Sequence, residues 1–375
     1  MSNVSEAAPS FHRRRSRAAL AWCLATLAVL QAAFYGALDR WPQIRDPEYG
    51  FKLARLRTQL AESPDRPLVL LVGSSRSGVG IDPKKFVAGH PADRSPLVFN
   101  FALSGAGPIQ HLMLLRQLLD AGIRPERLLV ELHPLFLNQS CGALREEARI
   151  DVHRLSHVGL ETLSDYSENP VRLRHQWWKW RLIPSHSYRH QLLDCLLPRF
   201  SAGPSQFAGF RQIDSFGWLP FPNLGKTELM RRALVEHARW EYHDCFPYFA
   251  VTREPDHALR TLLSLCRREK IGVTFFMMPE GGEFRSWYPP WARGKVDDYL
   301  GRLQREFRFE VHDLTTSMPD GAFADSHHLL PEAVGEFSAR FAREVIGAAI
   351  LHVPTAGDRE YLAEGPPPQG VENRR

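Results

Sequence analysis

One apolar segment near the start of the chain constrains its topology more than any other feature. From Ala18 to Leu38, 18 of 21 residues are apolar and none is charged. As a helix rising 1.5 Å per residue, this segment would extend about 31 Å, which matches the hydrocarbon core of a bilayer. We therefore expect one transmembrane helix over residues 18–38. A cleaved signal peptide is the alternative, although its apolar region is usually shorter, about 7–15 residues.

Charge on the two sides of this segment predicts its orientation. Residues 1–17 form a basic tail that contains four arginines, whereas no net charge follows directly after the segment. Basic residues are retained on the cytoplasmic side. We therefore expect a single-pass protein of the cytoplasmic (inner) membrane, with its N-terminus in the cytoplasm and its main domain in the periplasmic or extracellular space. The rest of the chain has 43 basic and 41 acidic side chains, so its net charge is small. A nucleic-acid partner is therefore not expected.

Beyond residue 38, short apolar runs alternate with patterns typical of helices. A linker helix is expected within residues 39–65. Strands are predicted at 67–72, 97–102, 128–132, 273–278 and 309–314, and helices at 109–121, 257–269, 296–307 and 331–350. Short continuous apolar strands separated by helices are typical of an open parallel sheet with helices on both faces. The sequence therefore predicts a three-layer α/β domain over residues 66–350.

About 120 residues, at 136–255, interrupt this alternation and are predicted to be an insertion in the domain. They contain the aromatic and basic cluster of residues 174–181, RHQWWKWR. We expect a helix there that buries its tryptophans and exposes its basic groups. A sugar-stacking platform and a patch lying on the membrane are the alternatives. Residues 351–375, rich in proline and glycine, are expected to be disordered.

Cysteine usage leaves the disulfide pattern open. Four cysteines, Cys141, Cys195, Cys245 and Cys266, would lie in an oxidising compartment. Three complete pairings are possible, and four unpaired thiols are an equally good interpretation. The chain has no paired-cysteine or HExxH motif, so neither a metal nor a cofactor is expected.

Polar segments follow several of the predicted strands. In an open α/β sheet, ligands bind where the carboxyl ends of the strands meet their loops. Gly73-Ser74-Ser75 follows the first strand, Gly105 follows the second, and a segment with Asp325 and His328 precedes the last helix. A serine on such a turn can attack a carbonyl when a histidine acts as its base and a carboxylate orients that histidine.

These segments resemble the motifs of the SGNH/GDSL hydrolase family. Gly73-Ser74-Ser75 stands where that family has Gly-Asp-Ser, and Asn100–Gly105 resembles its second block. Asp325-Ser326-His327-His328 is similar to the family's Asp-x-x-His. The family's third block, Gly-x-Asn-Asp, has no counterpart, because the third strand ends in Glu131-Leu132-His133-Pro134.

The resemblance implies an SGNH-type (flavodoxin-like) fold and a role for each matching residue. Ser75 would be the nucleophile, His328 its base and Asp325 the orienting carboxylate, while the N–H groups of Ser75 and Gly105 would form the oxyanion hole. Ser74 could replace Ser75, and His327 could replace His328. Further candidate substrate contacts at the strand ends are Ser74, Arg76, Asn100, His133, Glu280 and His327.

Together with the membrane segment, the Gly-Ser-Ser variant resembles membrane-anchored acyl-transfer members of this superfamily. These include the D-alanylation protein of teichoic acid synthesis and the SGNH-like alginate O-acetyltransferases. The resemblance implies a serine-dependent acyltransferase or esterase acting on an envelope polysaccharide, with a membrane-bound O-acyltransferase as acyl donor. The alternatives are a plain carboxylesterase or lipase, and a noncatalytic domain that binds glycan or acts as a scaffold.

Overall fold

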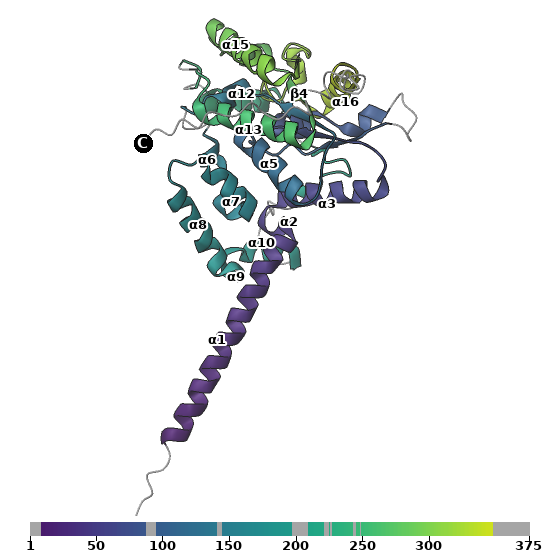
Figure 1. Ribbon diagram of the computed structural model, residues 1–375. Helices are drawn as coiled ribbons and strands as arrows, with labels where there is room; N and C mark the ends of the chain where they lie inside the picture. The colour runs from purple at the N-terminus through teal and green to yellow at the C-terminus, as the bar shows by residue number, and fades with distance from the viewer. Residues whose placement is uncertain are drawn as a thin grey trace, which may run out of the picture.

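The computed structural model describes residues 9–87, 95–140, 145–196, 209–220, 225, 227–242, 245–247 and 249–347. A long N-terminal helix projects from an α/β domain (Figure 1). The predicted disordered tail at 351–375 lies outside the described residues.

Five parallel strands form the centre of the domain, as predicted. They are β1 (Leu68–Val72), β2 (Leu97–Asn100), β3 (Arg127–Glu131), β4 (Gly272–Met277) and β5 (Glu310–Asp313). Their order in the sheet is β2-β1-β3-β4-β5, and every neighbouring pair is parallel. The chain leaves β1 toward one edge and then returns to its other side with β3. The loops after β1 and β3 therefore separate at this point, which is where doubly wound sheets bind ligands.

Helices cover both faces of the sheet. Leu68, Leu70 and Val72 of β1 belong to one apolar cluster, whereas Val69 and Leu71 belong to another on the opposite face. This alternation explains why the strand is apolar at every position, because parallel strands are buried on both faces. The first cluster includes α5 (Pro108–Asp120), α13 (Arg253–Glu269) and α15 (Pro290–Phe307), and the second includes α16 (Pro331–Phe341). The domain therefore has the three layers expected.

Residues 39–65 are part of the domain's core as well as its connection to the N-terminal helix. They form α2 (Pro42–Arg45) and α3 (Pro47–Glu62). Tyr49, Leu53 and Leu56 of α3 are buried within the first apolar cluster. The sequence indicated an amphipathic helix here, but it could not show which surface the apolar side would cover.

The N-terminal helix, α1 (Pro9–Arg40), contains the predicted transmembrane segment. Its part from Arg15 to Arg40 is the one described helix that is long and apolar enough to cross a membrane. The orientation of the chain and the location of its α/β domain remain predictions.

The described part of the insertion contains several helices, with irregular segments such as 211–220 between them. Its helices are α6 (Glu146–Arg149), α7 (His157–Ser164), α8 (Pro170–Leu182), α9 (Pro184–Ser187), α10 (Arg189–Leu196) and α12 (Glu228–Tyr242). On α8 the expected burial of the tryptophans is correct only for Trp177, because Trp178 and Trp180 are 56% and 40% exposed. Arg181 is instead buried against the Trp177 ring. Cys245 is disulfide-bonded, and Cys266 is a buried free thiol.

Candidate active site

The segment after β1 forms a tight turn that leads directly into α4 (Ser75–Gly80). Ser74 precedes the helix as its N-cap, and its hydroxyl accepts a hydrogen bond from the N–H of Arg76 at 3.2 Å. Gly73 is required by close packing, since a Cβ there would lie 2.5 Å from a Glu131 carboxylate oxygen. Ser75 is therefore the first residue of a helix at the carboxyl end of β1, with its side chain partly exposed.

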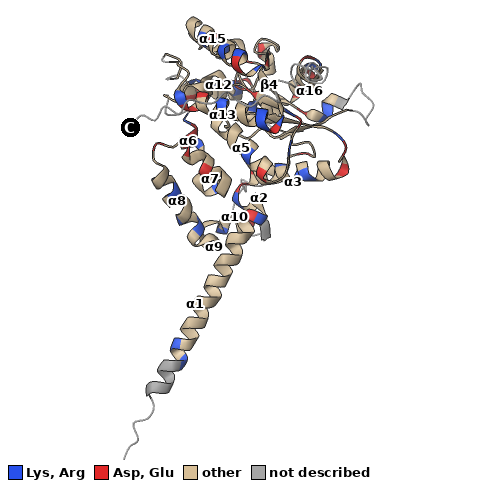
Figure 2. Ribbon diagram, in the orientation of Figure 1, with Lys and Arg blue, Asp and Glu red and all other residues tan. Residues whose placement is uncertain are grey.

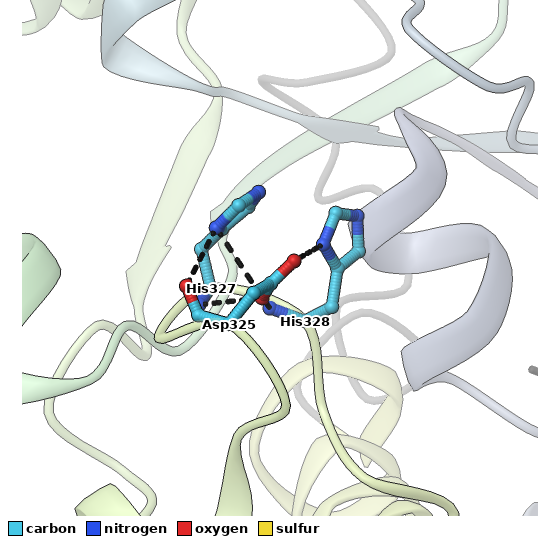
Figure 3. A group of neighbouring side chains, drawn as sticks. All are labelled: Asp325, His327 and His328. Carbon is cyan, nitrogen blue, oxygen red and sulfur yellow. Dashed lines mark hydrogen bonds and ion pairs between the residues drawn. The ribbon is translucent and has the colours of Figure 1, made fainter. Parts of the chain in front are cut away.

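Three residues from opposite ends of the domain meet at this turn. The Ser75 Oγ lies 2.8 Å from the His328 Nε2. The His328 Nδ1 in turn lies 2.7 Å from the Asp325 Oδ2 (Figure 3). Burial alone would raise the pKa of Asp325, but His328, His327 and their hydrogen bonds together lower it. The carboxylate therefore stabilises the folded chain above about pH 4, the ordinary pKa of aspartate. This contribution is lost progressively as the pH falls below that value toward the lowered pKa of Asp325.

The loop that carries Asp325 and His328 is held rigidly. The Asp325 Oδ1 accepts hydrogen bonds from the N–H groups of His327 and His328, at 3.1 and 2.7 Å. Ser326 adopts a left-handed conformation with φ of 70°, and its oxygens accept bonds from the N–H groups of Gly281 and Phe284. These contacts join the loop to the segment after β4, so the carboxylate and the imidazole keep one relative orientation.

His327 points away from Ser75. Its ring stacks on Phe284 at a centroid distance of 5.0 Å and meets the edge of Tyr242 at 5.5 Å. Burial, helped by the neighbouring His328, lowers the pKa of His327 to about 3, so this ring is neutral near pH 7. The structure thus places His328, and not the alternative His327, against the candidate nucleophile.

A buried carboxylate under the turn was not identified from the sequence. The Glu131 carboxylate, at the end of β3, accepts a 2.7 Å hydrogen bond from the Ser74 N–H and a 3.0 Å bond from the Ser74 hydroxyl. It also accepts a 2.5 Å bond from the Ser77 hydroxyl. The N–H and the hydroxyl of Ser74 are therefore both bonded to Glu131 below the turn. Ser75 is left as the serine whose hydroxyl contacts His328. A polar residue ending an apolar strand was the only available signal.

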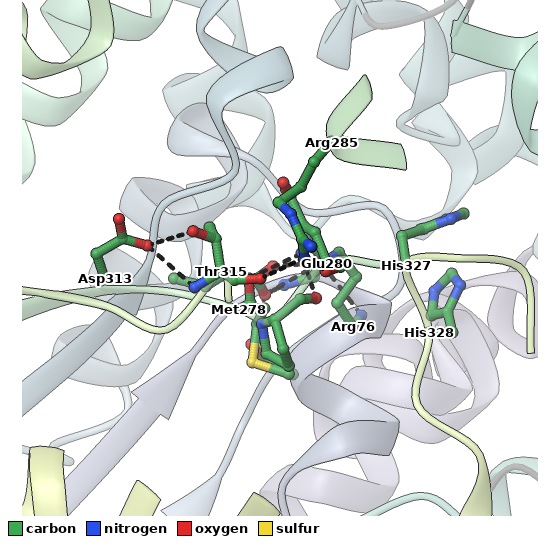
Figure 4. A network of polar contacts seen from close by, with 12 residues as sticks. Arg76, Met278, Glu280, Arg285, Asp313, Thr315, His327 and His328 are labelled. Atoms are coloured by element: carbon green, nitrogen blue, oxygen red, sulfur yellow. Dashed lines mark hydrogen bonds and ion pairs between the residues drawn. The ribbon is translucent and has the colours of Figure 1, made fainter. Parts of the chain in front are cut away.

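A second buried network joins the turn to the segment after β4 (Figure 4). The Arg76 guanidinium lies 3.3 Å from the Glu280 carboxylate and donates to the carbonyls of Met278 and Pro279. Burial raises the pKa of Glu280, while Arg76 opposes that shift. Because both side chains are almost fully buried, the pair holds α4 in place over the sheet.

Asn100 has a similar internal role. Its amide donates to the carbonyls of Ser77 and Ile81, and its side-chain oxygen accepts from the N–H of Ala102. Like Ser74, Arg76 and Glu280, it forms hydrogen bonds to other groups of the protein. The prediction that these four residues contact substrate remains untested, and their contacts here support the shape of the site.

The loop after β2 is positioned by α3. The buried Lys52 ammonium donates to the carbonyls of Asn100 and Ala102, and the Glu48 carboxylate accepts from the N–H and hydroxyl of Ser104. Burial lowers the pKa of Lys52 to about 8. The next residue, Gly105, has a φ of 73°, which glycine adopts without the steric cost that a side chain brings. The candidate oxyanion loop is thus tied to the helix that follows the membrane segment.

Among the side chains near this loop, His133 and Arg149 have buried nitrogen atoms without a hydrogen-bond partner among the described residues. These atoms are both ring nitrogens of His133 and the Nη1 of Arg149. His133 is 4% exposed and packs on Phe136 at 4.6 Å, and the Arg149 guanidinium lies 4.5 Å over the same ring. The Arg149 Nη2 is 2.8 Å from where a Cβ of Gly105 would stand. Unpartnered buried donors are costly, so a group supplied by a ligand would be well accommodated here.

Asp325, His327 and His328 also offer ligand-type atoms within 4.8 Å of one another. Both ring nitrogens of His328 already contact protein groups, the Ser75 hydroxyl and the Asp325 carboxylate. A metal would have to displace one of these contacts. The arrangement is that of a proton relay between a hydroxyl, an imidazole and a carboxylate.

Neither a protein-family model nor a curated protein matches this sequence. Inferences about its function therefore depend on the site itself.

Proposed function

We propose that this chain is a membrane-anchored serine acyltransferase or esterase of the SGNH type, which transfers an acyl group to or from a hydroxyl of an envelope glycan. The observation that supports it most is the contact series Ser75–His328–Asp325, at 2.8 and 2.7 Å. A noncatalytic glycan-binding domain would have no need to hold an imidazole between a hydroxyl and a buried carboxylate.

The reaction would proceed in two halves. His328 takes the proton of the Ser75 hydroxyl as its oxygen attacks the acyl carbonyl of the donor ester, and then returns that proton to the departing alcohol. The acyl group is now esterified to Ser75. In the second half, a glycan hydroxyl, or water in an esterase, loses its proton to His328 and attacks the acyl carbonyl of the acyl-enzyme. The bond from the acyl group to the Ser75 oxygen then breaks, and that oxygen takes the proton back from His328. Asp325 holds the His328 ring in the required tautomer and stabilises its protonated form.

The negative charge that develops on the carbonyl oxygen needs donors. The Ser75 N–H lies in the first turn of α4, where helical N–H groups have no partner within the helix. The N–H of Gly105 is the second candidate, and the Arg149 guanidinium lies against that glycine. We infer that Arg149 takes the place of the asparagine donor that the sequence lacks.

We expect Arg149→Met to lower the rate of acyl transfer by about 10²-fold, as loss of one oxyanion donor does in other enzymes. The matched control is Arg145→Met, because Arg145 lies on the same segment but forms ion pairs with Glu147 and Glu168. Initial rates with one ester substrate would measure both variants. Equal rates for Arg149→Met and Arg145→Met would remove Arg149 from the mechanism.

A pocket lined by aromatic and charged side chains is suited to a sugar. It has a volume of about 390 Å³, and Phe246, Trp287, Arg239 and Glu283 are among the residues that line it. Trp287 contacts Phe284, which in turn stacks on His327 beside the relay. Aromatic faces with charged groups at their edges bind the apolar and hydroxyl sides of sugars. In this proposal a membrane-bound O-acyltransferase supplies the acyl group and the pocket holds the glycan acceptor.

Transferase and esterase activities differ in how they use water. A transferase protects its acyl-enzyme until the acceptor arrives, so the purified full chain should hydrolyse simple aryl esters slowly. Addition of glycan acceptors should raise its turnover by about tenfold or more. Release of the aryl alcohol, followed with and without acceptor, would measure this. Fast hydrolysis that acceptors leave unchanged would favour the plain esterase.

The proposed location also has a direct test. A reporter enzyme that is active only outside the cytoplasm should be active when fused after Arg375, because basic residues before the apolar segment retain the N-terminus inside. The same reporter fused before Met1 should be inactive. The reverse pattern, or release of the α/β domain from membranes by signal peptidase, would contradict the anchor.

A further inference from the structure

The end of α8, with α9 and the first part of α10, lies beside the upper part of α1 (Figure 1). We call residues 178–193 the proximal segment. The Gln31 side-chain amide of α1 donates to the Ser185 hydroxyl at 2.8 Å and accepts from the Ser185 N–H at 3.2 Å. Farther along α1, the Arg181 guanidinium lies 5.2 Å from the ring of Tyr35, about one turn beyond Gln31, and pairs with Asp39, about two turns beyond it. These contacts fix the height of the proximal segment along α1.

That height can be compared with the thickness of a membrane. From Ala18, the first uncharged residue after the arginines, to Gln31 is only about 20 Å of helix, whereas the hydrocarbon core is about 30 Å thick. A helix that spans the bilayer from its basic end must therefore continue about 10 Å beyond Gln31, to about Leu38. Ser185, in contact with Gln31, then lies below the membrane surface on the side of the α/β domain.

Gln31 supports this depth. An unpaired amide is costly within a bilayer, where no water replaces its lost hydrogen bonds. Here both the donor and the acceptor of the Gln31 amide are bonded to Ser185. Ser185 follows Pro184 at the start of α9, so its N–H would otherwise also lack a partner.

The side chains that the proximal segment leaves uncovered fit a lipid environment. Leu182 is 75% exposed and Ile183 is 51% exposed, although both are apolar. The other exposed large apolar side chains of the segment are Trp178, Trp180 and Leu193. Tryptophan is enriched at the level of lipid headgroups.

Charge on the proximal segment is also suited to headgroups. It contains the exposed Lys179 and Arg189 and no acidic residue, whereas Arg181 is buried and paired with Asp39. Figure 2 shows basic positions on α8 and around α9, level with the upper end of α1. Basic residues beside exposed tryptophan and leucine are typical of helices that lie in the membrane interface.

We propose that the proximal segment is a second membrane contact, inserted into the leaflet on the side of the α/β domain, with its apolar side chains among the lipids. This inference rests on the proposal that α1 spans the membrane. Together the two contacts hold the domain in one orientation above the bilayer, because a single helix alone would leave it free to rotate and tilt.

Site-specific labelling of the full chain in nanodiscs of phosphatidylcholine and phosphatidylglycerol tests the proposal. In a Cys23→Ala background, an environment-sensitive fluorophore is attached through Leu182→Cys, Leu27→Cys or Leu229→Cys, and the background chain measures labelling elsewhere. Leu27 lies in α1, and Leu229 is an apolar residue of α12 that is 79% exposed. Quenching by nitroxide-labelled lipid and by aqueous iodide is then compared.

We expect the label at 182 to behave like that at 27, with lipid quenching at least roughly threefold stronger than at 229. Water-like behaviour at 182, with lipid quenching at 27, would overturn the inference and leave the anchor in place. Protection from iodide without lipid quenching would also overturn it, because a second copy of the chain would then cover the segment. Water-like behaviour at both 27 and 182 would overturn the anchor as well.

Discussion

Replacing Ser75 by alanine is expected to abolish acyl transfer and labelling by a fluorophosphonate probe. The variant removes only the hydroxyl group, whose oxygen lies 2.8 Å from the His328 imidazole. Loss of a serine nucleophile in such a relay lowers the rate by about 10⁴- to 10⁶-fold. Because the Ser75 side chain is partly exposed, the melting temperature should stay close to that of the unaltered chain. Probe labelling and ester turnover are the measurements.

The control is Ser63→Ala, because Ser63 ends α3 just before β1, at the opposite edge of the sheet from Ser75, and is likewise partly exposed. It should keep full activity. His328→Ala should lower the rate of acyl transfer as much as Ser75→Ala does. The double variant should lower it little further, because the two residues act as one unit. Asp325→Asn should be milder than either. Labelling that persists in Ser75→Ala but disappears in a variant of another serine would refute the assignment of the nucleophile.

Replacing Glu131 by alanine is expected to destabilise the domain by about 3–5 kcal/mol and to abolish activity. The variant would leave buried donors of Ser74 and Ser77 without an acceptor, and it would open space below Gly73. Folded domains have only about 5–15 kcal/mol of stability in total. Urea unfolding followed by tryptophan fluorescence would measure the change.

Glu126→Ala is the matched control, since Glu126 precedes the same strand but is exposed. Its stability should change by less than about 0.5 kcal/mol. Glu131→Gln keeps the size of the side chain and one acceptor oxygen. Its free energy of unfolding should therefore lie between those of Glu131→Ala and Glu126→Ala. A Glu131→Ala chain as stable as the Glu126→Ala control would show that the turn is held by other contacts.

The parts of the fold that follow from local patterns were predictable. Strands such as β1 are apolar at every position because both faces are covered, and the alternation with helices indicates a parallel sheet. The apolar length of α1 is likewise a property of one continuous segment. Ser75, Asp325 and His328 could be selected because motifs at the carboxyl ends of parallel strands converge on one edge of the sheet.

Long-range packing decided the rest. The choice of His328 over His327, which are neighbours in sequence, depends on which ring meets Ser75 and which stacks on Phe284. The Asp-x-x-His spacing favoured His328 through a family resemblance, but it left His327 as an alternative, because each ring's surroundings come from distant segments. The same holds for Trp177 and Trp178, of which only the first is buried.

The sequence by itself therefore determined a helix long and apolar enough to cross a membrane, the class of sheet and the residues available for chemistry, since these depend on composition and spacing along the chain. Only the tertiary structure placed Glu131 beneath the serine turn, brought α3 into the core and set Ser185 against Gln31. The physical reason is that a buried polar group or an amphipathic face can be satisfied by many partners. Which partner it meets is decided by the packing of the whole domain.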